Sequence, residues 1–295
     1  MFPSGALTRH RTRAVQLVLV VVAIAVPLLT LPSLPELDWW PAALGLLPWV
    51  VGKYVLCPLR WHALSESGRS RAWHVRAYAE SELCGLLTPG HVGADAWRVR
   101  RLHRNGMALP DAVAEAGLDR LVGAIGLAAF VGLSATALPT RMLVTALGVA
   151  AVAVAVAVVV GRLRPELVPH RRLPRGRALA FGIAVSAAYQ LSIVLLLLGT
   201  IAATGHTLGP LALLGAFGAS QLAGVVPGPN GASPRDGALV VALAGLGLPW
   251  SAALGAVALK ATLAWLPALL LGGVSLLLAR RLGSSYAHAH APAPA

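Results

Sequence analysis

The sequence predicts an all-α, polytopic integral membrane protein, and its composition and hydropathy pattern carry this prediction. The chain has 295 residues, of which 57% are hydrophobic and only 12% are charged, whereas soluble domains carry about 25% charged residues. Long stretches such as 14–35, 142–161 and 178–234 contain no Asp, Glu, Lys or Arg. Because about 20 apolar residues cross the hydrocarbon core of a bilayer, a single soluble globule is excluded.

The placement of the arginines predicts the topology. Arg9, Arg11 and Arg13 precede the first apolar stretch, and Arg280 and Arg281 follow the last one. Positive residues favour the cytoplasmic side, so both termini are expected there, with the protein in the cytoplasmic membrane. The net charge of +13 then belongs to basic loops beside anionic lipid headgroups rather than to nucleic-acid binding. The six expected full spans cover about 14–35, 40–58, 111–138, 142–160, 178–203 and 251–279.

Two further segments, 78–104 and 208–248, have to enter and leave on one side if the basic loops are all cytoplasmic. Each contains a Pro-Gly break near its middle, which predicts a re-entrant hairpin of two half-helices. The chain crosses the membrane an even number of times between two cytoplasmic loops, and this count puts the first hairpin on the cytoplasmic side and the second on the outside. For 208–248, two ordinary spans satisfy the same parity, and this alternative stays open.

The two breaks resemble each other. The first, 89–95, and the second, 227–236, both end on an aspartate, and each aspartate lies eleven residues before a loop glycine. Similar hairpins of opposite orientation indicate an inverted repeat, an architecture typical of secondary transporters. We expect one transmembrane domain over 1–280, made of repeat A (about 14–138) and repeat B (about 142–280). The Ala/Pro-rich segment 281–295 is expected to be a disordered tail.

Charged residues inside the membrane are functional candidates, because each costs about 2.5–3.5 kcal/mol on insertion scales. Arg120 and Lys260 occupy matching places in the two repeats and are expected to face each other and hold a phosphate headgroup. A structural alternative pairs Arg120 with Asp119 or Asp95. The other expected headgroup-binding residues are Arg98, Arg235, Gly90, Gly93, Gly228 and Gly231, and the expected coupling or pairing acids are Asp95, Asp119, Asp236, Glu80 and Glu82.

The breaks offer a second kind of anion site, because a half-helix begins after each one and presents free N–H groups and its positive dipole end. The glycines there would let a headgroup approach the backbone; the alternative is that they only shape tight turns. Asp95 and Asp236 would cap the half-helices, pair with Arg98 and Arg235, or carry protons.

Four motifs follow one another along the chain: Leu59-Arg60-Trp61, Thr88-Pro89-Gly90, Leu118-Asp119-Arg120-Leu121, and Pro229-Asn230-Gly231 with Arg235-Asp236. In this order they resemble the flippase-like membrane domain of lysylphosphatidylglycerol synthases, over about 14–280. The resemblance implies movement of a lipid between leaflets or service to a lipid-linked sugar pathway. The lysine-attaching domain of the synthases is absent from this sequence, so synthase activity is not expected. The late motif and Lys260 depart from the family's usual Glu and Arg.

The leading hypothesis is a flippase-like transporter, not an enzyme, for an anionic phospholipid or a polyprenyl-phosphate-linked lipid. Sequence motifs for zinc proteases, nucleotide-binding loops and serine nucleophiles are missing, so no catalytic residue, metal or cofactor is expected. Two rival hypotheses are an enzyme of lipid-linked glycan transfer and an accessory subunit that assembles with envelope glycosyltransferases.

Overall fold

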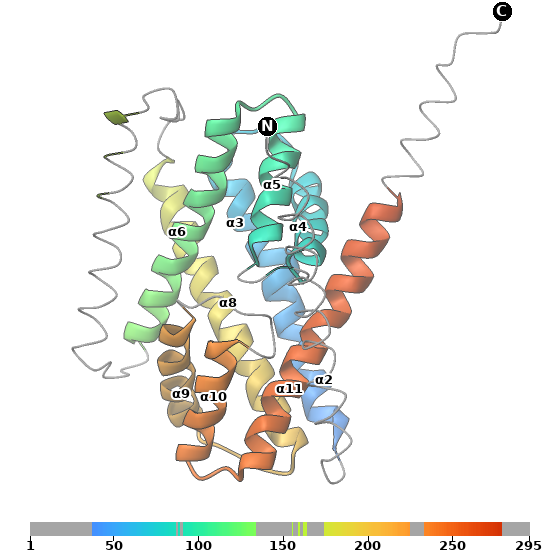
Figure 1. The fold of residues 1–295 in the computed structure, drawn as a ribbon, viewed down its shortest axis with the longest axis vertical. Coiled ribbons are helices and arrows are strands. Elements are labelled where there is room, and N and C mark those ends of the chain that lie inside the picture. Colours follow the sequence, from blue (N-terminus) through green and yellow to red (C-terminus); the bar gives the residue numbers. More distant parts are fainter. Residues whose placement is uncertain are drawn as a thin grey trace, which may run out of the picture.

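Every element in the described part of the chain is a helix (Figure 1). The computed structural model describes residues 37–86, 88, 91–133, 155, 159, 162–163, 174–224 and 233–278. The expected span 14–35, most of 142–160, residues 227–232 of the second break and the tail lie outside these residues. The helices are α2 (Trp39–Val51), the π-helix η2 (Gly52–Leu56), α3 (Cys57–Leu64), α4 (Arg71–Leu86), α5 (Val92–Arg104), α6 (Leu109–Leu133), α8 (Gly176–Ala203), α9 (Pro210–Ala223), α10 (Pro234–Gly245), α11 (Trp250–Pro267) and the π-helix η5 (Ala268–Gly272).

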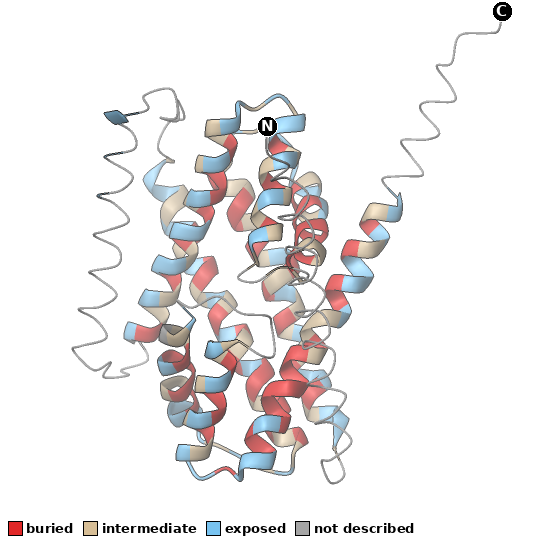
Figure 2. Cartoon of the chain, in the orientation of Figure 1, coloured by how far each residue is buried: buried red, intermediate tan, exposed pale blue. Residues whose placement is uncertain are grey.

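Within the described residues, three helices are long and apolar enough to cross a membrane: Trp39–Leu64, Gly176–Ala203 and Trp250–Leu278. They coincide with three of the expected spans, although the first runs past position 58 because α2 continues through η2 into α3. Their outer faces expose large apolar side chains, among them Leu47 and Leu270 (Figure 2). Water does not favour such faces, whereas lipid tails do, so the helices are those of a membrane protein.

Two pairs of shorter helices complete the described fold (Figure 1). The pair α4 and α5 occupies the upper part of the molecule in this view, and the pair α9 and α10 occupies the lower part. The helices α9 and α10 have 14 and 12 residues, fewer than the about 20 needed to span. The turn from α5 to α6 and the turn from α10 to α11 lie at opposite ends of the molecule.

The second helix of each pair ends in the same way. Gly106 and Gly247 have positive φ values of 94° and 97°, a conformation that glycine adopts without steric cost. The N–H of the next residue then donates to a carbonyl five residues back, from Met107 to Leu102 at 3.3 Å and from Leu248 to Leu243 at 3.2 Å. This is the Schellman pattern of helix ends.

Glycines let the long helices pack closely. A Cβ at Gly45 on α2 would lie 2.7 Å from the carbonyl oxygen of Leu195 on α8. A Cβ at Gly182 on α8 would lie 2.8 Å from Val122 on α6. Small residues at such crossings are the usual means by which membrane helices associate. As a result α8 lies against both α2 and α6.

Candidate functional site

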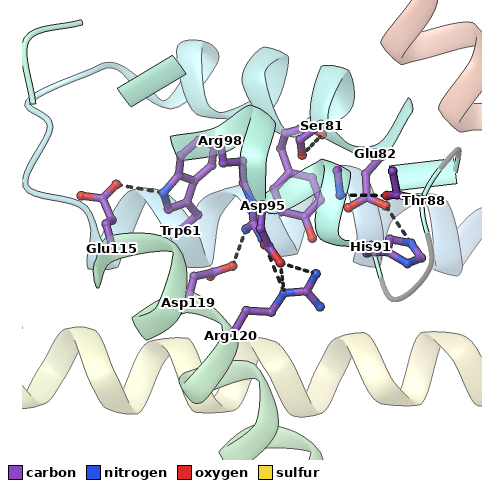
Figure 3. Close-up of polar contacts among 12 residues, drawn as sticks. Trp61, Ser81, Glu82, Thr88, His91, Asp95, Arg98, Glu115, Asp119 and Arg120 are labelled. Atoms are coloured by element: carbon purple, nitrogen blue, oxygen red, sulfur yellow. Dashed lines mark hydrogen bonds and ion pairs between the residues drawn. The ribbon is translucent and has the colours of Figure 1, made fainter. Parts of the chain in front are cut away.

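An alternating series of arginines and aspartates links α3, α5 and α6. Figure 3 shows the part of it that Arg98, Asp95, Asp119 and Arg120 form. Arg60 donates to Asp119 through Nε at 2.7 Å and through Nη2 at 2.9 Å. Arg98 donates to the same carboxylate through Nη1 at 2.7 Å and to Asp95 through Nη2. Arg120 closes the series on Asp95, with Nε at 3.0 Å and Nη2 at 2.9 Å from Oδ2. Three guanidinium groups therefore share two carboxylates.

Burial changes along this series. The side chain of Asp119 is 1% exposed and that of Arg98 is 4% exposed, whereas Arg120 is 49% and Asp95 is 31% exposed. Arg60 is anchored further by donating from Nη1 to the hydroxyl of Ser186 on α8 at 3.0 Å. The buried arginines Arg60 and Arg98 are held by their hydrogen bonds. The three arginines carry one more charge than the two carboxylates, so the unmatched positive charge lies at the half-exposed Arg120.

A second group of charges lies beside the break between α4 and α5. Lys53, carried by η2, places Nζ 3.0 Å from Oε2 of Glu82, and His91 places Nε2 3.8 Å from the same oxygen. The imidazole of His91 and the ammonium group of Lys53 therefore face the same carboxylate at this break.

The backbone around this break is tightly built. His91 precedes α5 with φ 60° and ψ 23°, and the N–H of Gly93 donates to Oγ1 of Thr88 at 2.8 Å. A Cβ at Gly93 would lie 2.6 Å from the carbonyl oxygen of Cys84. Close packing of the turn thus accounts for glycine at this position. Gly90, Gly228 and Gly231 lie outside the described residues.

Glu80 joins the first helix pair to the last long helix. Its Oε2 accepts from Nε1 of Trp97 at 3.1 Å and lies 3.2 Å from Nε of Arg101. Its Oε1 accepts from the hydroxyl of Ser275 at 3.0 Å. Glu80 is 1% and Glu82 is 6% exposed, so neither lies at a water interface. The two acids instead connect α4 to different neighbouring helices.

The second helix pair has a corresponding ion pair. Lys260 on α11 donates to Oδ1 of Asp236 at 3.1 Å, and Asp236 also forms a capping box with Ser233 at the start of α10. Asp236 and Lys260 are 24 residues apart, and Asp95 and Arg120 are 25 apart. Each pair connects the first turn of a second helix to the long helix that follows. Unlike Arg120, Lys260 is only 11% exposed.

The structure thus groups the predicted residues differently from the sequence analysis. No contact joins Arg120 to Lys260 among the described residues, because each is held by the aspartate of its own helix pair. Arg235 lies beside Asp236 in sequence, yet within the described part of the chain it has no hydrogen-bond or ion-pair partner. Of the two cations that the sequence pairs, Arg120 is the more exposed, at 49% against 11% for Lys260.

The sequence does not single out four charged residues of these networks as site candidates: Lys53, Arg60, Arg101 and Glu115. Glu115 accepts from Nε1 of Trp61 at 2.9 Å and from the N–H of Glu66 at 3.2 Å. The signal for Lys53 is present, since it is the single charge in the expected span 40–58 and such a charge marks a functional or paired position. Arg60 is not identified because it follows the expected span 40–58, where a cytoplasmic loop was expected. Across the described residues, His, Cys, Asp and Glu form no group of three or more that could hold a metal ion.

These features define a helical membrane protein with buried charge networks, one that joins α3, α5 and α6 and one that joins α10 and α11. Residues 13–272 match the family described as lysylphosphatidylglycerol synthase TM region. The match covers most of the chain, so the chain belongs to this family, as its motifs predict. No curated protein and no solved structure matches the chain.

Proposed function

We propose that the protein is a flippase-like transporter that moves an anionic or phosphate-linked lipid between the leaflets of the cytoplasmic membrane. The observation that carries this proposal is Arg120, a half-exposed arginine near the middle of α6 at the open end of a buried charge network. A lipid phosphate could replace part of its contact with Asp95, because a guanidinium group binds phosphate through two parallel hydrogen bonds. Membership of a membrane-domain family named for a lipid synthase supports a lipid-related role.

The arrangement of the helix pairs also supports transport. In this proposal α4–α5 and α9–α10 are re-entrant hairpins that enter from opposite sides, and their breaks meet near the middle of the membrane. The opposite directions of the turns after α5 and α10 (Figure 1) agree with such an inverted repeat. Transporters with inverted repeats bind their substrate between the repeats and expose it to each side by rocking. The basic residues that flank the spans then place both termini in the cytoplasm.

The state of the carboxylates favours transport over acid–base catalysis. The buried acids of the described helices, Glu80, Glu82, Glu115, Asp119 and Asp236, each contact a cation or an N–H donor. A general acid or base has to reach the substrate to exchange a proton. Carboxylates that already contact buried cations or N–H donors are suited to holding the charged side chains of a binding site in position.

The proposal is tested by lipid translocation in reconstituted vesicles. Fluorescent phosphatidylglycerol in the inner leaflet becomes accessible to an added quencher only after it crosses the bilayer. We expect faster crossing with the protein than in protein-free vesicles, and loss of most of this increase in Arg120→Gln. The matched control is Arg104→Gln, which removes the same charge from an exposed position at the end of α5. Equal rates with and without protein, or an unchanged rate in Arg120→Gln, would overturn the proposal.

A further inference from the structure

The contact between Arg120 and Asp95 has the geometry of a phosphate contact. Nε of Arg120 lies 3.2 Å from Oδ1 and 3.0 Å from Oδ2 of Asp95, and Nη2 lies 2.9 Å from Oδ2. Two nitrogens of one guanidinium group on two oxygens form the fork by which arginine binds a carboxylate or a phosphate. The carboxylate of Asp95 therefore occupies the face of Arg120 that a phosphate headgroup would need (Figure 3).

The carboxylate of Asp95 also lacks the backbone contacts that fix its counterpart in the second ion pair. Within the described part of the chain, its hydrogen-bond and ion-pair partners are the guanidinium groups of Arg98 and Arg120. Asp236, in contrast, accepts from the backbone N–H and the hydroxyl of Ser233. The side chain of Asp95 is 31% exposed and that of Asp236 is 2% exposed. Of the two aspartates, Asp95 is thus the one that can separate from its cation.

Arg98 gives Asp95 a partner that remains when Arg120 leaves. Its Nη2 donates to Asp95 from three residues further along the same helix. Its Nη1 donates to Asp119 on α6 at 2.7 Å, so α5 stays joined to α6 whatever Arg120 contacts. Loss of the last partner would be costly for a buried charge. An exchange at Arg120 avoids this cost, because both aspartates keep a guanidinium group.

We propose that Asp95 is the resident counter-ion of Arg120, which occupies the guanidinium group in the empty site, gives way to a lipid phosphate, and displaces that phosphate when it returns. This inference rests on the proposed function and identifies how the headgroup is released. Asp95 acts through Arg120 and is a positioning residue. Its carboxylate weakens lipid binding by competition and speeds lipid release for the same reason.

Calorimetric titration of the purified protein in uncharged detergent with dioctanoyl phosphatidylglycerol tests the competition. Asp95→Asn keeps the shape of the side chain and removes its charge. We expect it to bind the lipid about tenfold more tightly than the wild type, as the loss of one competing charge-assisted contact predicts. Asp95→Glu, which keeps the carboxylate, should bind no more tightly than the wild type. Unchanged or weaker binding by Asp95→Asn would overturn the inference.

Two further variants assign the gain to Arg120. The matched control is Glu66→Gln, which removes a negative charge from an exposed position in the turn between α3 and α4 and should leave the affinity unchanged. An equal gain in this control would attribute the effect to overall charge and overturn the inference. The double variant Asp95→Asn with Arg120→Gln should lose the gain, and a gain that persists there would also overturn it.

Translocation provides a readout that a purely structural role would not produce. In vesicles composed mainly of phosphatidylglycerol the site is saturated, so the rate depends on release. Asp95→Asn should therefore move the lipid more slowly than the wild type although it binds the lipid more tightly, whereas a structural defect would lower both. A wild-type rate in Asp95→Asn would contradict release by Asp95. Failure of Asp95→Asn to fold would contradict the inference too, because a displaceable carboxylate is not required for the fold.

The same measurements separate this inference from the proposed function. A wild-type protein that neither binds nor moves phosphatidylglycerol would contradict the proposed function, whereas a wild type that does both, with Asp95→Asn unchanged, would contradict only the counter-ion. Glycerophosphoglycerol, the headgroup without acyl chains, distinguishes a lipid from a soluble phosphate and should bind more weakly than the lipid. Equal binding of the two would leave the exchange at Arg120 intact but contradict the lipid substrate.

Discussion

Asp119→Asn should destabilise the protein because Asp119 is the most deeply buried carboxylate of the series that joins α3, α5 and α6. Asp119 is 1% exposed and accepts three hydrogen bonds, two from Arg60 at 2.7 and 2.9 Å and one from Arg98 at 2.7 Å. Removing one partner of a buried ion pair costs about 3–5 kcal/mol, because the remaining charge is left without compensation. Asparagine retains one carbonyl acceptor of nearly the same shape. We therefore expect the free energy of unfolding to fall by about 3 kcal/mol, at the lower end of that range.

The assay is equilibrium unfolding of the purified protein in mixed micelles of increasing sodium dodecyl sulfate content, followed by tryptophan fluorescence. The matched control is Glu66→Gln, which neutralises an exposed acid in the turn between α3 and α4. Surface substitutions of this kind change stability by about 0.5 kcal/mol or less. If Asp119→Asn is no less stable than Glu66→Gln, the buried network does not hold α3, α5 and α6 together.

Three further predictions concern the second ion pair, helix packing and topology. Lys260→Met should lower the free energy of unfolding by about 3–5 kcal/mol because Asp236 is left without its cation. Addition of Asp236→Asn should recover most of this loss in the same unfolding assay. Equal stability of the single and double variants would contradict the pairing. Gly45→Ala should lower the free energy of unfolding by about 1–3 kcal/mol, since its Cβ would lie 2.7 Å from a backbone oxygen of α8. Unchanged stability would show that α2 and α8 are not in close contact. Positions Glu66 and Thr207 are both exposed. In a cysteine-free background, a single cysteine at each position should react with a membrane-impermeant maleimide, the two from opposite sides of the membrane. Labelling of both from the same side would contradict the arrangement of the spans.

The helical segments follow from the sequence because hydrophobicity and helix punctuation are local properties. The expected spans 178–203 and 251–279 nearly coincide with Gly176–Ala203 and Trp250–Leu278. Likewise, the equal spacing of Gly106 and Gly247 from their aspartates corresponds to equal helix ends in the structure. Local signals of this kind act within a few residues, so they are visible in one sequence.

The charge pairings do not follow from the sequence because they join distant residues. Lys260 suggests a free cation, since no acid lies near it in sequence, yet Asp236 reaches it from another helix 24 residues away. Similarly, Glu80 and Glu82 are two positions apart on α4 and point toward different partners, Arg101 and Lys53, because successive helical residues turn by about 100°. Such contacts depend on how the helices pack, which hydropathy does not encode.

The identity of the lipid that copurifies with the protein tests the central claim most directly. The protein would be extracted in mild detergent, and its retained lipids would be measured by mass spectrometry beside those of the source membrane. Our account predicts enrichment of a lipid with a phosphate headgroup in the wild-type protein and loss of that enrichment in Arg120→Gln, with Arg104→Gln unchanged. Retained lipids that match the source membrane in composition, or enrichment that persists in Arg120→Gln, would contradict it.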